Sequence, residues 1–447
     1  MKLKKIYKSV IASLTALALC SLCACSTATQ SGDTSSQSSA QSSEGSSVDN
    51  ESSESTSNTS SDLSDASSDA ESSTESESNT NEPETDFDKY VSNTVVATGN
   101  NYFLETADNI TYRAYFPLEQ YGELEYKFYF SNTVDSTYNY KGDKAYVGKP
   151  GGSYTVSNAC IADGGTGPDD EITNRVPVTF DGESSKEVTA NETYWSDTAT
   201  INIAEGHYLV WEWTVNGDEI PCTKMSTLTS TTSSTDGENF GYCDEIPLPQ
   251  LIGADRAVKH TVAAIGDSIT QGCQTDFMAY EFWAAQFADR LGEQNSFWNC
   301  GLGWARASDA AVCGDWLNRT KTADIVLVAF GTNDIGAGNY GGAKNTAEEI
   351  EAYLTTIVNE LKSAGCTVIL FNSPPQGYKE KNEAVRTALN ERIPELAKEL
   401  GAEYFDFAGL LCDASDPATP LYGGHPNGEA GTIVADELIK QFGSLFE

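Results

Sequence analysis

The sequence has 447 residues, which is enough for two ordinary domains and additional tails. Its 66 acidic and 27 basic residues give a formal net charge of −39 at pH 7. A charge of this size argues against nucleic acid or an anionic membrane surface as an electrostatic partner.

The first 25 residues have the composition of an export signal. Four lysines between Lys2 and Lys8 precede the apolar run 11–19, which is shorter than the roughly 20 residues of a membrane-spanning helix. The run ends in Leu-Cys-Ala-Cys at 22–25, which is similar to a bacterial lipobox. We therefore expect a lipoprotein signal peptide over 1–25, with lipidation of Cys25 and an extracellular protein anchored to the bacterial cell membrane. An ordinary signal peptide with incidental cysteines is the alternative.

Residues 26–86 consist mainly of Ser, Thr, Glu, Asp and Asn, with almost no apolar side chain. Such a segment buries too little surface to offset the entropy lost on ordering. We expect a disordered linker that extends from the lipid anchor.

Alternating apolar residues begin at about Phe87 and predict short strands over 87–255. The alternation is clearest at Leu124–Phe130 and Leu209–Val215, and shorter strands are expected at Tyr112–Phe116, Val176–Phe180 and Thr200–Ile203. Many strands without an amphipathic helix predict an all-β sandwich, jelly-roll-like, whose core includes Trp211 and Trp213.

The pattern changes again after residue 249, and β and α segments alternate over 256–447. Strands are expected at His260–Ile265, Phe297–Asn299, Ala323–Phe330, Thr367–Asn372 and Glu403–Phe407. Helices are expected at Phe277–Leu291, Thr346–Ala364, Glu380–Leu400 and Glu429–Phe442. This order predicts an α/β domain, a parallel sheet covered by helices on both faces, with its chemistry in the loops after the strands.

Four of these loops carry residues suited to ester hydrolysis. Ser268 follows the first strand as a nucleophile, a glycine after the second strand lets the backbone approach and donate an N–H, and Asn333 follows the third strand. His425 is the base, because it alone of the three histidines lies in such a loop. Asp267 and Asp334 are interpreted as structural, Asp267 as a helix cap.

These four blocks resemble those of the SGNH or GDSL hydrolases, which centre on Ser, Gly, Asn and His. Ser268, Gly303 (or Gly301), Asn333 and His425 match them in order over about 258–447. The resemblance implies a flavodoxin-like three-layer αβα domain, with an oxyanion hole formed by Ser268, Gly303 and Asn333. No metal and no other cofactor are expected.

The sequence departs from the family pattern in two places. Tyr422 stands where the family has the Asp that orients the histidine, so either a backbone carbonyl holds His425 or Asp416 or Asp413 substitutes. Trp304 stands where one alignment of the second block has its glycine. The oxyanion donor is then the N–H of Gly303 or of Trp304.

The expected activity is serine ester hydrolysis, with removal of O-acetyl or other short acyl groups from polysaccharide at the cell surface. The partner is thus an acylated carbohydrate or another ester; nucleic acid is not expected, and the membrane is contacted only through the lipid anchor. A lipase acting on lipid or small esters, and a non-catalytic glycan-binding protein on the same scaffold, are the alternatives.

Eight cysteines follow Cys25, and an even number in an exported protein permits disulfides. The pairs to test first are Cys222–Cys243 and Cys300–Cys313, and buried free thiols are the alternative. The spacing has no Cys-x-x-Cys pair and no nearby histidine, so no zinc site is expected.

Overall fold

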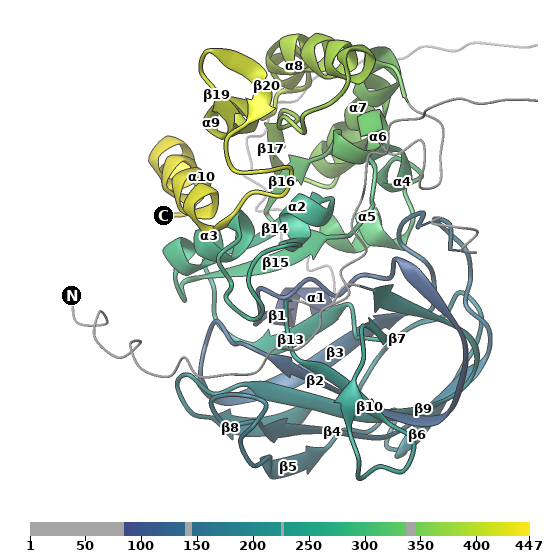
Figure 1. Ribbon diagram of the computed structural model, residues 1–447. Helices are drawn as coiled ribbons and strands as arrows, with labels where there is room; N and C mark the ends of the chain where they lie inside the picture. The colour runs from purple at the N-terminus through teal and green to yellow at the C-terminus, as the bar shows by residue number, and fades with distance from the viewer. Residues whose placement is uncertain (1–84, 139–144, 225–227, 337–344) are drawn as a thin grey trace, which may run out of the picture. The chain divides into compact units, whose positions relative to one another are not determined.

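The computed structural model describes residues 85–138, 145–224, 228–336 and 345–447 (Figure 1). All of them belong to one compact unit, Asn79–Glu447. The expected signal peptide with Cys25, and the linker up to residue 84, lie outside the described residues. Within the described ranges no helix is both long and apolar enough to cross a membrane.

The β-rich part contains two antiparallel sheets, preceded by the one-turn helix α1 (Asp86–Lys89). The first sheet has the order β1-β13-β3-β7, with β8 also paired to β3, and comprises β1 (Tyr90–Ser92), β3 (Gly122–Ser131), β7 (Thr193–Trp195), β8 (Ala199–Ile203) and β13 (Leu251–Asp255). The second has the order β11-β10-β2-β9-β4-β5, with β12 on β9 and β6 on β4, and comprises β2 (Tyr102–Phe116), β4 (Tyr154–Asp163), β5 (Thr173–Pro177), β6 (Ser185–Val188), β9 (Leu209–Lys224), β10 (Thr231–Ser234), β11 (Gly241–Tyr242) and β12 (Glu245–Ile246).

The two sheets pack through aromatic side chains. Phe128 of β3 lies 4.4 Å from Trp211 of β9, measured between ring centroids. Trp211 and Trp213 are 0% and 1% exposed, so both belong to the core and neither is available as a sugar platform. The expected β-sandwich is confirmed.

The second part contains a parallel five-stranded sheet with the order β15-β14-β16-β17-β18. Its strands are β14 (His260–Gly266), β15 (Asn295–Gly301), β16 (Ile325–Ala329), β17 (Thr367–Phe371) and β18 (Glu403–Phe405). The helices are α2 (Ser268–Gln271), α3 (Trp283–Leu291), α4 (Ala307–Ala310), α5 (Asp315–Thr320), α6 (Thr332–Gly336), α7 (Ala347–Ser363), α8 (Glu380–Leu400), α9 (Phe407–Leu411), α10 (Gly428–Phe442) and the 3₁₀ turn η1 (Gly443–Leu445). A hairpin of β19 (Cys412–Asp413) and β20 (Asp416–Pro420) follows α9.

Alternate side chains of this sheet enter two separate cores. Ala263 and Ile265 of β14 pack with residues of α5, α7 and α8, whereas Val262 and Ala264 pack with residues of α3, α9 and α10. The sheet is therefore covered on both faces (Figure 1), which confirms the three-layer αβα prediction.

The strand order locates the crevice of the α/β part. The first strand, β14, lies between the second and the third, so the chain leaves β14 in one direction and later returns on its other side. In such sheets the loops diverge at the carboxyl end of this strand and leave room for a ligand. Ser268 directly follows that strand end.

Several element boundaries differ from those expected, and two of the differences have a clear local cause. Helix α3 begins at Trp283 rather than at Phe277, because Met278 and Tyr280 adopt left-handed backbone conformations, with φ of 54° and 52°, which a helix cannot include. Strand β5 ends at Pro177, and only an isolated bridge involves Phe180. Proline has no N–H to continue the ladder.

The pairings suggested for the cysteines were wrong. None of the eight cysteines of the described residues forms a disulfide. The thiol of Cys243 donates to the carbonyl of Glu245, and that of Cys313 donates to the carbonyl of Ala311. Each is thus directed at its own local backbone instead of at a second sulfur.

Candidate active site

Ser268 is the first residue of α2, at the carboxyl end of β14. The carboxylate of Asp267 caps this helix by accepting the N–H of Ile269 at 2.9 Å, as expected for a structural aspartate. The chain has little room to turn here, because a Cβ on Gly266 would lie 2.2 Å from Thr270 Oγ1. This tight turn leaves the Ser268 side chain 8% exposed at the start of the helix.

His425 lies 157 positions after Ser268 in the sequence, and the fold brings the two side chains together. The Oγ of Ser268 and the Nε2 of His425 are 2.8 Å apart. The loop that carries His425 is held by Gln376, whose amide donates to the Gly424 carbonyl at 2.7 Å. The other histidines lie elsewhere, since His207 bonds to Asp163 in the β-rich part and His260 begins β14 at the opposite end of the sheet.

Neither aspartate suggested as an orienting acid contacts His425. Asp413 accepts hydrogen bonds from the backbone and hydroxyl of Ser415, and Asp416 accepts one from Thr419, all within the β19–β20 hairpin. Tyr422 packs against the apolar core that includes α3 and α10. Among the described residues the Nδ1 of His425 therefore has no hydrogen-bond partner, and neither of the two alternatives, a backbone carbonyl or an aspartate, is observed.

Burial lowers the pKa of His425 below its ordinary value, because the charged imidazolium is poorly solvated in this position. A neutral ring is therefore favoured at neutral pH. A neutral imidazole can accept a proton at Nε2, which is the atom that faces Ser268.

Asn333 lies in the first turn of α6, directly after β16. Its amide nitrogen donates to the Ala305 carbonyl at 2.9 Å. Since a side-chain amide carries two N–H groups, this contact orients the group and leaves one hydrogen for a ligand. Asp334, the next residue, accepts the N–H of Ala307 at 3.0 Å and ties α6 to the start of α4.

Gly301, the last residue of β15, and Gly303, which follows the strand, have different roles. The Gly301 N–H donates to the side-chain oxygen of Asn299 at 2.9 Å, so it is already paired. A Cβ on Gly301 would lie 2.3 Å from the Gln271 nitrogen, so this glycine permits close packing with α2. The Gly303 N–H has no hydrogen-bond acceptor among the described residues, which leaves Gly303 as the better donor of the two.

Two buried carboxyl groups lie behind the site. Burial raises the pKa of Asp267 to about 7 and that of Asp334 to about 6. The negative charge of Asp334 raises the pKa of Asp267 further, whereas backbone N–H groups that bond to Asp334 partly offset the rise in its own pKa. Asp267 accepts a hydrogen bond from the backbone of Ile269, and Asp334 accepts hydrogen bonds from the backbones of Ala307 and Ser308. We assign both to support of the loops, as expected.

The oxyanion loop, defined here as Leu302–Arg306, also contacts the β-rich part, which the sequence did not predict. The side-chain amide of Asn101 donates to the Gly303 carbonyl at 3.2 Å, and the ring of Trp304 lies 5.7 Å from that of Tyr138. No motif marks these contacts, since they join residues more than 160 positions apart.

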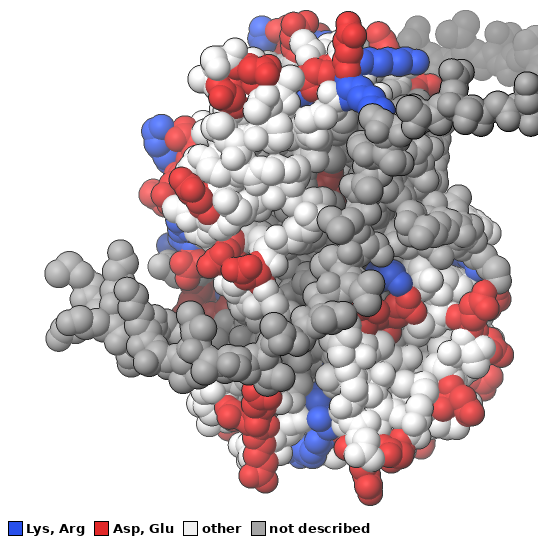
Figure 2. Space-filling model, viewed as in Figure 1, with Lys and Arg blue, Asp and Glu red and all other residues white. Residues whose placement is uncertain are grey.

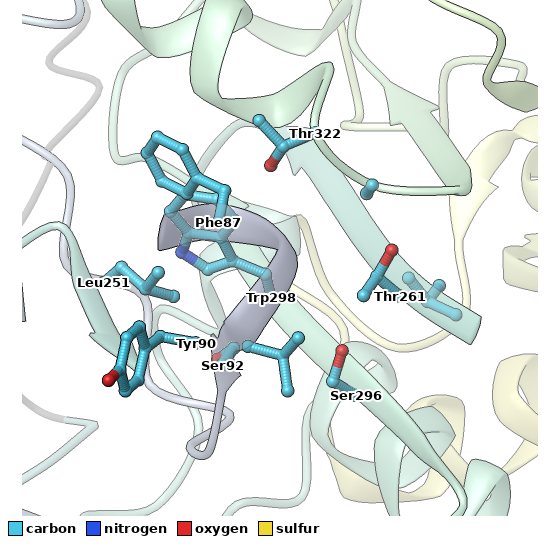
Figure 3. Close-up of a pocket in the computed structure, with 11 residues that line it drawn as sticks. Phe87, Tyr90, Ser92, Leu251, Thr261, Ser296, Trp298 and Thr322 are labelled. Carbon is cyan, nitrogen blue, oxygen red and sulfur yellow. The ribbon is translucent and has the colours of Figure 1, made fainter. Parts of the chain in front are cut away.

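Another pocket of the structure lies far along the sheet from these groups. Thr261, Ser296 and Thr322 line it together with Phe87 and Trp298 (Figure 3). The threonines and the serine stand at the amino ends of β14 and β15 and just before β16, so this pocket is at the opposite end of the strands from Ser268. Among the described residues no group of three or more His, Cys, Asp or Glu could hold a metal ion.

Acidic side chains are spread over the visible face of both parts (Figure 2). They do not gather around one position on that face, so the surface charge does not itself indicate a ligand. The chemistry of the site must be argued from Ser268, His425 and Asn333.

Comparison with known proteins gives the same assignment for this segment. Residues 264–431 match the model of the GDSL-like Lipase/Acylhydrolase family. No curated protein matches the sequence.

Among solved structures, similar chains include a member of the lipolytic protein G-D-S-L family from Veillonella parvula (20% identity, TM-score 0.35, covering 41% of this chain and 98% of that one). Others are a GDSL-like lipase from Bacteroides thetaiotaomicron (18%, 0.34, 41% and 88%) and the psychrotrophic esterase EstA from Pseudoalteromonas sp. (17%, 0.31, 41% and 97%).

Proposed function

Residues 264–431 form a GDSL-like lipase/acylhydrolase domain, and from this premise we propose that the protein is a serine carboxylic ester hydrolase. The observation that carries the proposal is the 2.8 Å separation of Ser268 Oγ and His425 Nε2. A hydroxyl this close to a neutral imidazole can be deprotonated as it attacks.

In the proposed reaction Ser268 Oγ bonds to the ester carbonyl carbon while its proton passes to His425 Nε2. The negative charge that forms on the carbonyl oxygen is stabilised by the N–H groups of Ser268 and Gly303 and by the amide of Asn333. The carbon–oxygen bond to the alcohol then breaks, and His425 returns the proton to the leaving alcohol. Water repeats the sequence on the acyl-enzyme, giving its proton to His425, and releases the carboxylic acid and the free Ser268 hydroxyl.

We propose O-acetyl or other short acyl groups on polysaccharide as the substrate. Trp304 supports this choice, because its half-buried ring adjoins the Gly303 donor and is backed by Tyr138. An aromatic face beside the oxyanion donors suits a sugar ring on the alcohol side of the ester.

We further propose that the protein acts at the outer surface of a bacterial cell, tethered through lipid on Cys25. The lipobox-like residues at 22–25 support this proposal. The wild type should incorporate a labelled fatty acid, and a Cys25→Ser variant, which has no thiol to be lipidated, should not. Equal incorporation of the label by the variant would overturn the anchor on Cys25.

The test of the activity has two stages. Hydrolysis of 4-nitrophenyl acetate by the purified wild type, and its loss in Ser268→Ala and His425→Ala, tests the chemistry. Acetate release from a panel of acetylated xylan, mannan and other glycans then tests the substrate. Turnover of longer acyl esters or lipid emulsions in preference to these glycans would favour a lipase instead.

A wild-type protein that binds the glycans but releases no acid from any ester would overturn the enzyme proposal. That result would indicate a non-catalytic glycan-binding protein. The two variants would then bind glycan as the wild type does.

A further inference from the structure

We propose that Asn101, in the β-rich part, is a positioning residue for the oxyanion loop, which makes the β-rich part a required component of the active site. This inference rests on the proposed hydrolase function. Asn101 itself does not touch the reacting atoms; it acts on the loop through the Gly303 carbonyl.

The inference begins with an unusual segment of the chain, residues 93–101. It joins β1 to β2 without forming a helix or a strand, and every residue in it except Val95 is buried. Buried polar groups are costly unless they are paired. Here the side chains of Asn93, Asn100 and Asn101 are all hydrogen-bonded, so the segment has one defined conformation.

This segment contacts the second block of the α/β part at three successive points. The Val95 carbonyl accepts a hydrogen bond from Asn299 at 3.3 Å. Gly99 packs against Leu302 so closely that a Cβ would lie 3.1 Å from its Cδ1. Asn101 then donates to the Gly303 carbonyl at 3.2 Å.

The Asn101 amide is anchored at both of its polar atoms. Its oxygen accepts the N–H of Lys224 at 2.8 Å, and its nitrogen also donates to the Lys224 carbonyl at 3.3 Å. This pairing with the end of β9 fixes the amide plane, so the second N–H of the nitrogen is directed at Gly303. Asn101 is 0% exposed and therefore has no water to pair with in place of these groups.

Holding the Gly303 carbonyl fixes a peptide plane. The carbonyl of Gly303 and the N–H of Trp304 belong to the same planar trans peptide and point in opposite directions. The contact with Asn101 therefore sets the direction of the Trp304 N–H and limits the backbone freedom of Gly303. The N–H groups of Gly303 and Trp304 are the two backbone donors considered for the oxyanion.

The loop needs such support because its conformation is not intrinsically favoured. Trp304 has φ of 67°, in the left-handed region that costs a bulky residue free energy. Packing of its ring against Tyr138 is a second contact that holds this conformation from the β-rich part.

An ion pair fixes the two parts next to these contacts. Arg319 of α5 bonds to both carboxylate oxygens of Asp135, at 2.9 and 2.6 Å, and both side chains are almost fully buried. Asp135 also accepts the N–H of Asn100 at 2.8 Å. Asn100, the residue before Asn101, is thereby linked through Asp135 and Arg319 to the α/β part, which also contains the oxyanion loop.

The test compares Asn101→Asp with Asn93→Asp, in the full chain. Both substitutions remove one buried amide donor from segment 93–101, but the partners of Asn93 are Gln120, Tyr126 and Arg256, which do not contact the oxyanion loop. In Asn101→Asp a carboxylate oxygen faces the Gly303 carbonyl, and the repulsion should rotate that peptide.

With 4-nitrophenyl acetate we expect kcat of Asn101→Asp to fall by about 10-fold or more, and KM to change by less than about 3-fold, since loss of a complete oxyanion donor costs about 100- to 1,000-fold. The affinity for a boronic acid, which mimics the tetrahedral intermediate, should fall in parallel. Asn93→Asp should keep kcat within about 2-fold per folded molecule even where its melting temperature falls, because its partners do not touch the site.

If Asn101→Asp is not recovered as folded protein, Asn101→Ala provides the same comparison, since it removes the donor without adding a charge. Full kcat in either Asn101 variant would overturn the inference, as would equal losses in the Asn93 and Asn101 variants. An active wild type with an active Asn101 variant refutes this inference alone. An inactive wild type refutes the proposed hydrolase function, and the inference with it.

Discussion

Replacement of Asn333 by alanine tests the oxyanion site most directly. The amide of Asn333 has two N–H groups, and one is used in the contact with the Ala305 carbonyl at 2.9 Å. The variant therefore removes one donor from the developing oxyanion. It also leaves the backbone carbonyl of Ala305, a buried residue, without its partner.

These two losses have different sizes and different observables. Removal of one oxyanion donor lowers kcat by about 100- to 1,000-fold, which corresponds to about 2.7–4 kcal/mol of transition-state stabilisation. Loss of the contact with Ala305 leaves a buried acceptor unpaired and costs about 1–3 kcal/mol of folding stability. The expected variant is thus folded, slightly less stable, and strongly impaired in turnover.

The assay is kcat/KM for 4-nitrophenyl acetate, converted to a free-energy difference from the ratio of wild type to variant, together with thermal unfolding. Asn318→Ala is the matched control, because Asn318 is an exposed asparagine whose amide also donates to a backbone carbonyl, that of Cys313, away from the site. A decrease of less than about 5-fold in Asn333→Ala, or an equal decrease in Asn318→Ala, would refute the role given to Asn333.

Three further predictions concern the base, the link between the parts and the hairpin. Because burial lowers the pKa of His425 and only the neutral ring accepts the proton of the serine, kcat/KM should rise with pH and reach half its maximum below the ordinary value of 6.5; a midpoint above that value in the pH profile would contradict this. Arg319→Ala should lower the free energy of unfolding by about 3–5 kcal/mol in chemical denaturation, because it leaves Asp135 buried without its partner. The double variant Arg319→Met, Asp135→Leu should recover much of this loss. An Arg319→Ala variant as stable as the wild type would show that the pair is not needed. Asp413→Asn and Asp416→Asn should each keep kcat/KM within about 2-fold, because their carboxylates bond within their own hairpin, and a loss of about 100-fold in either would identify it as the acid that orients His425.

The reacting groups were accessible from the sequence because each belongs to a short motif at a strand end. A nucleophile and a donor must lie close to the substrate, and in a parallel sheet the carboxyl ends of neighbouring strands meet at one edge. Finding the apolar strands was therefore sufficient to expect Ser268 and Asn333 together. The position of His425 followed from the small number of histidines.

The groups that hold these residues were not accessible in this way. Asn101 and Gly303 lie 202 positions apart, and nothing in an isolated asparagine indicates which carbonyl it will reach. The start of α3 was missed for a related reason. The apolar pattern around Phe277 suits a helix, but Met278 and Tyr280 adopt left-handed conformations that local preference does not predict.

The surroundings of His425 increase the share of transition-state stabilisation that the oxyanion loop must provide. Where a carboxylate accepts the Nδ1–H of the base, it stabilises the imidazolium that forms in the transition state. The described residues supply no carboxylate to His425, and burial further disfavours the charged ring. More of the transition-state stabilisation must then come from the developing oxyanion. The fold meets this requirement by holding the oxyanion loop from both parts of the chain, with Asn333 on one side and Asn101 on the other. We therefore expect turnover to be sensitive to substitutions that affect the oxyanion loop and insensitive to those in the β19–β20 hairpin.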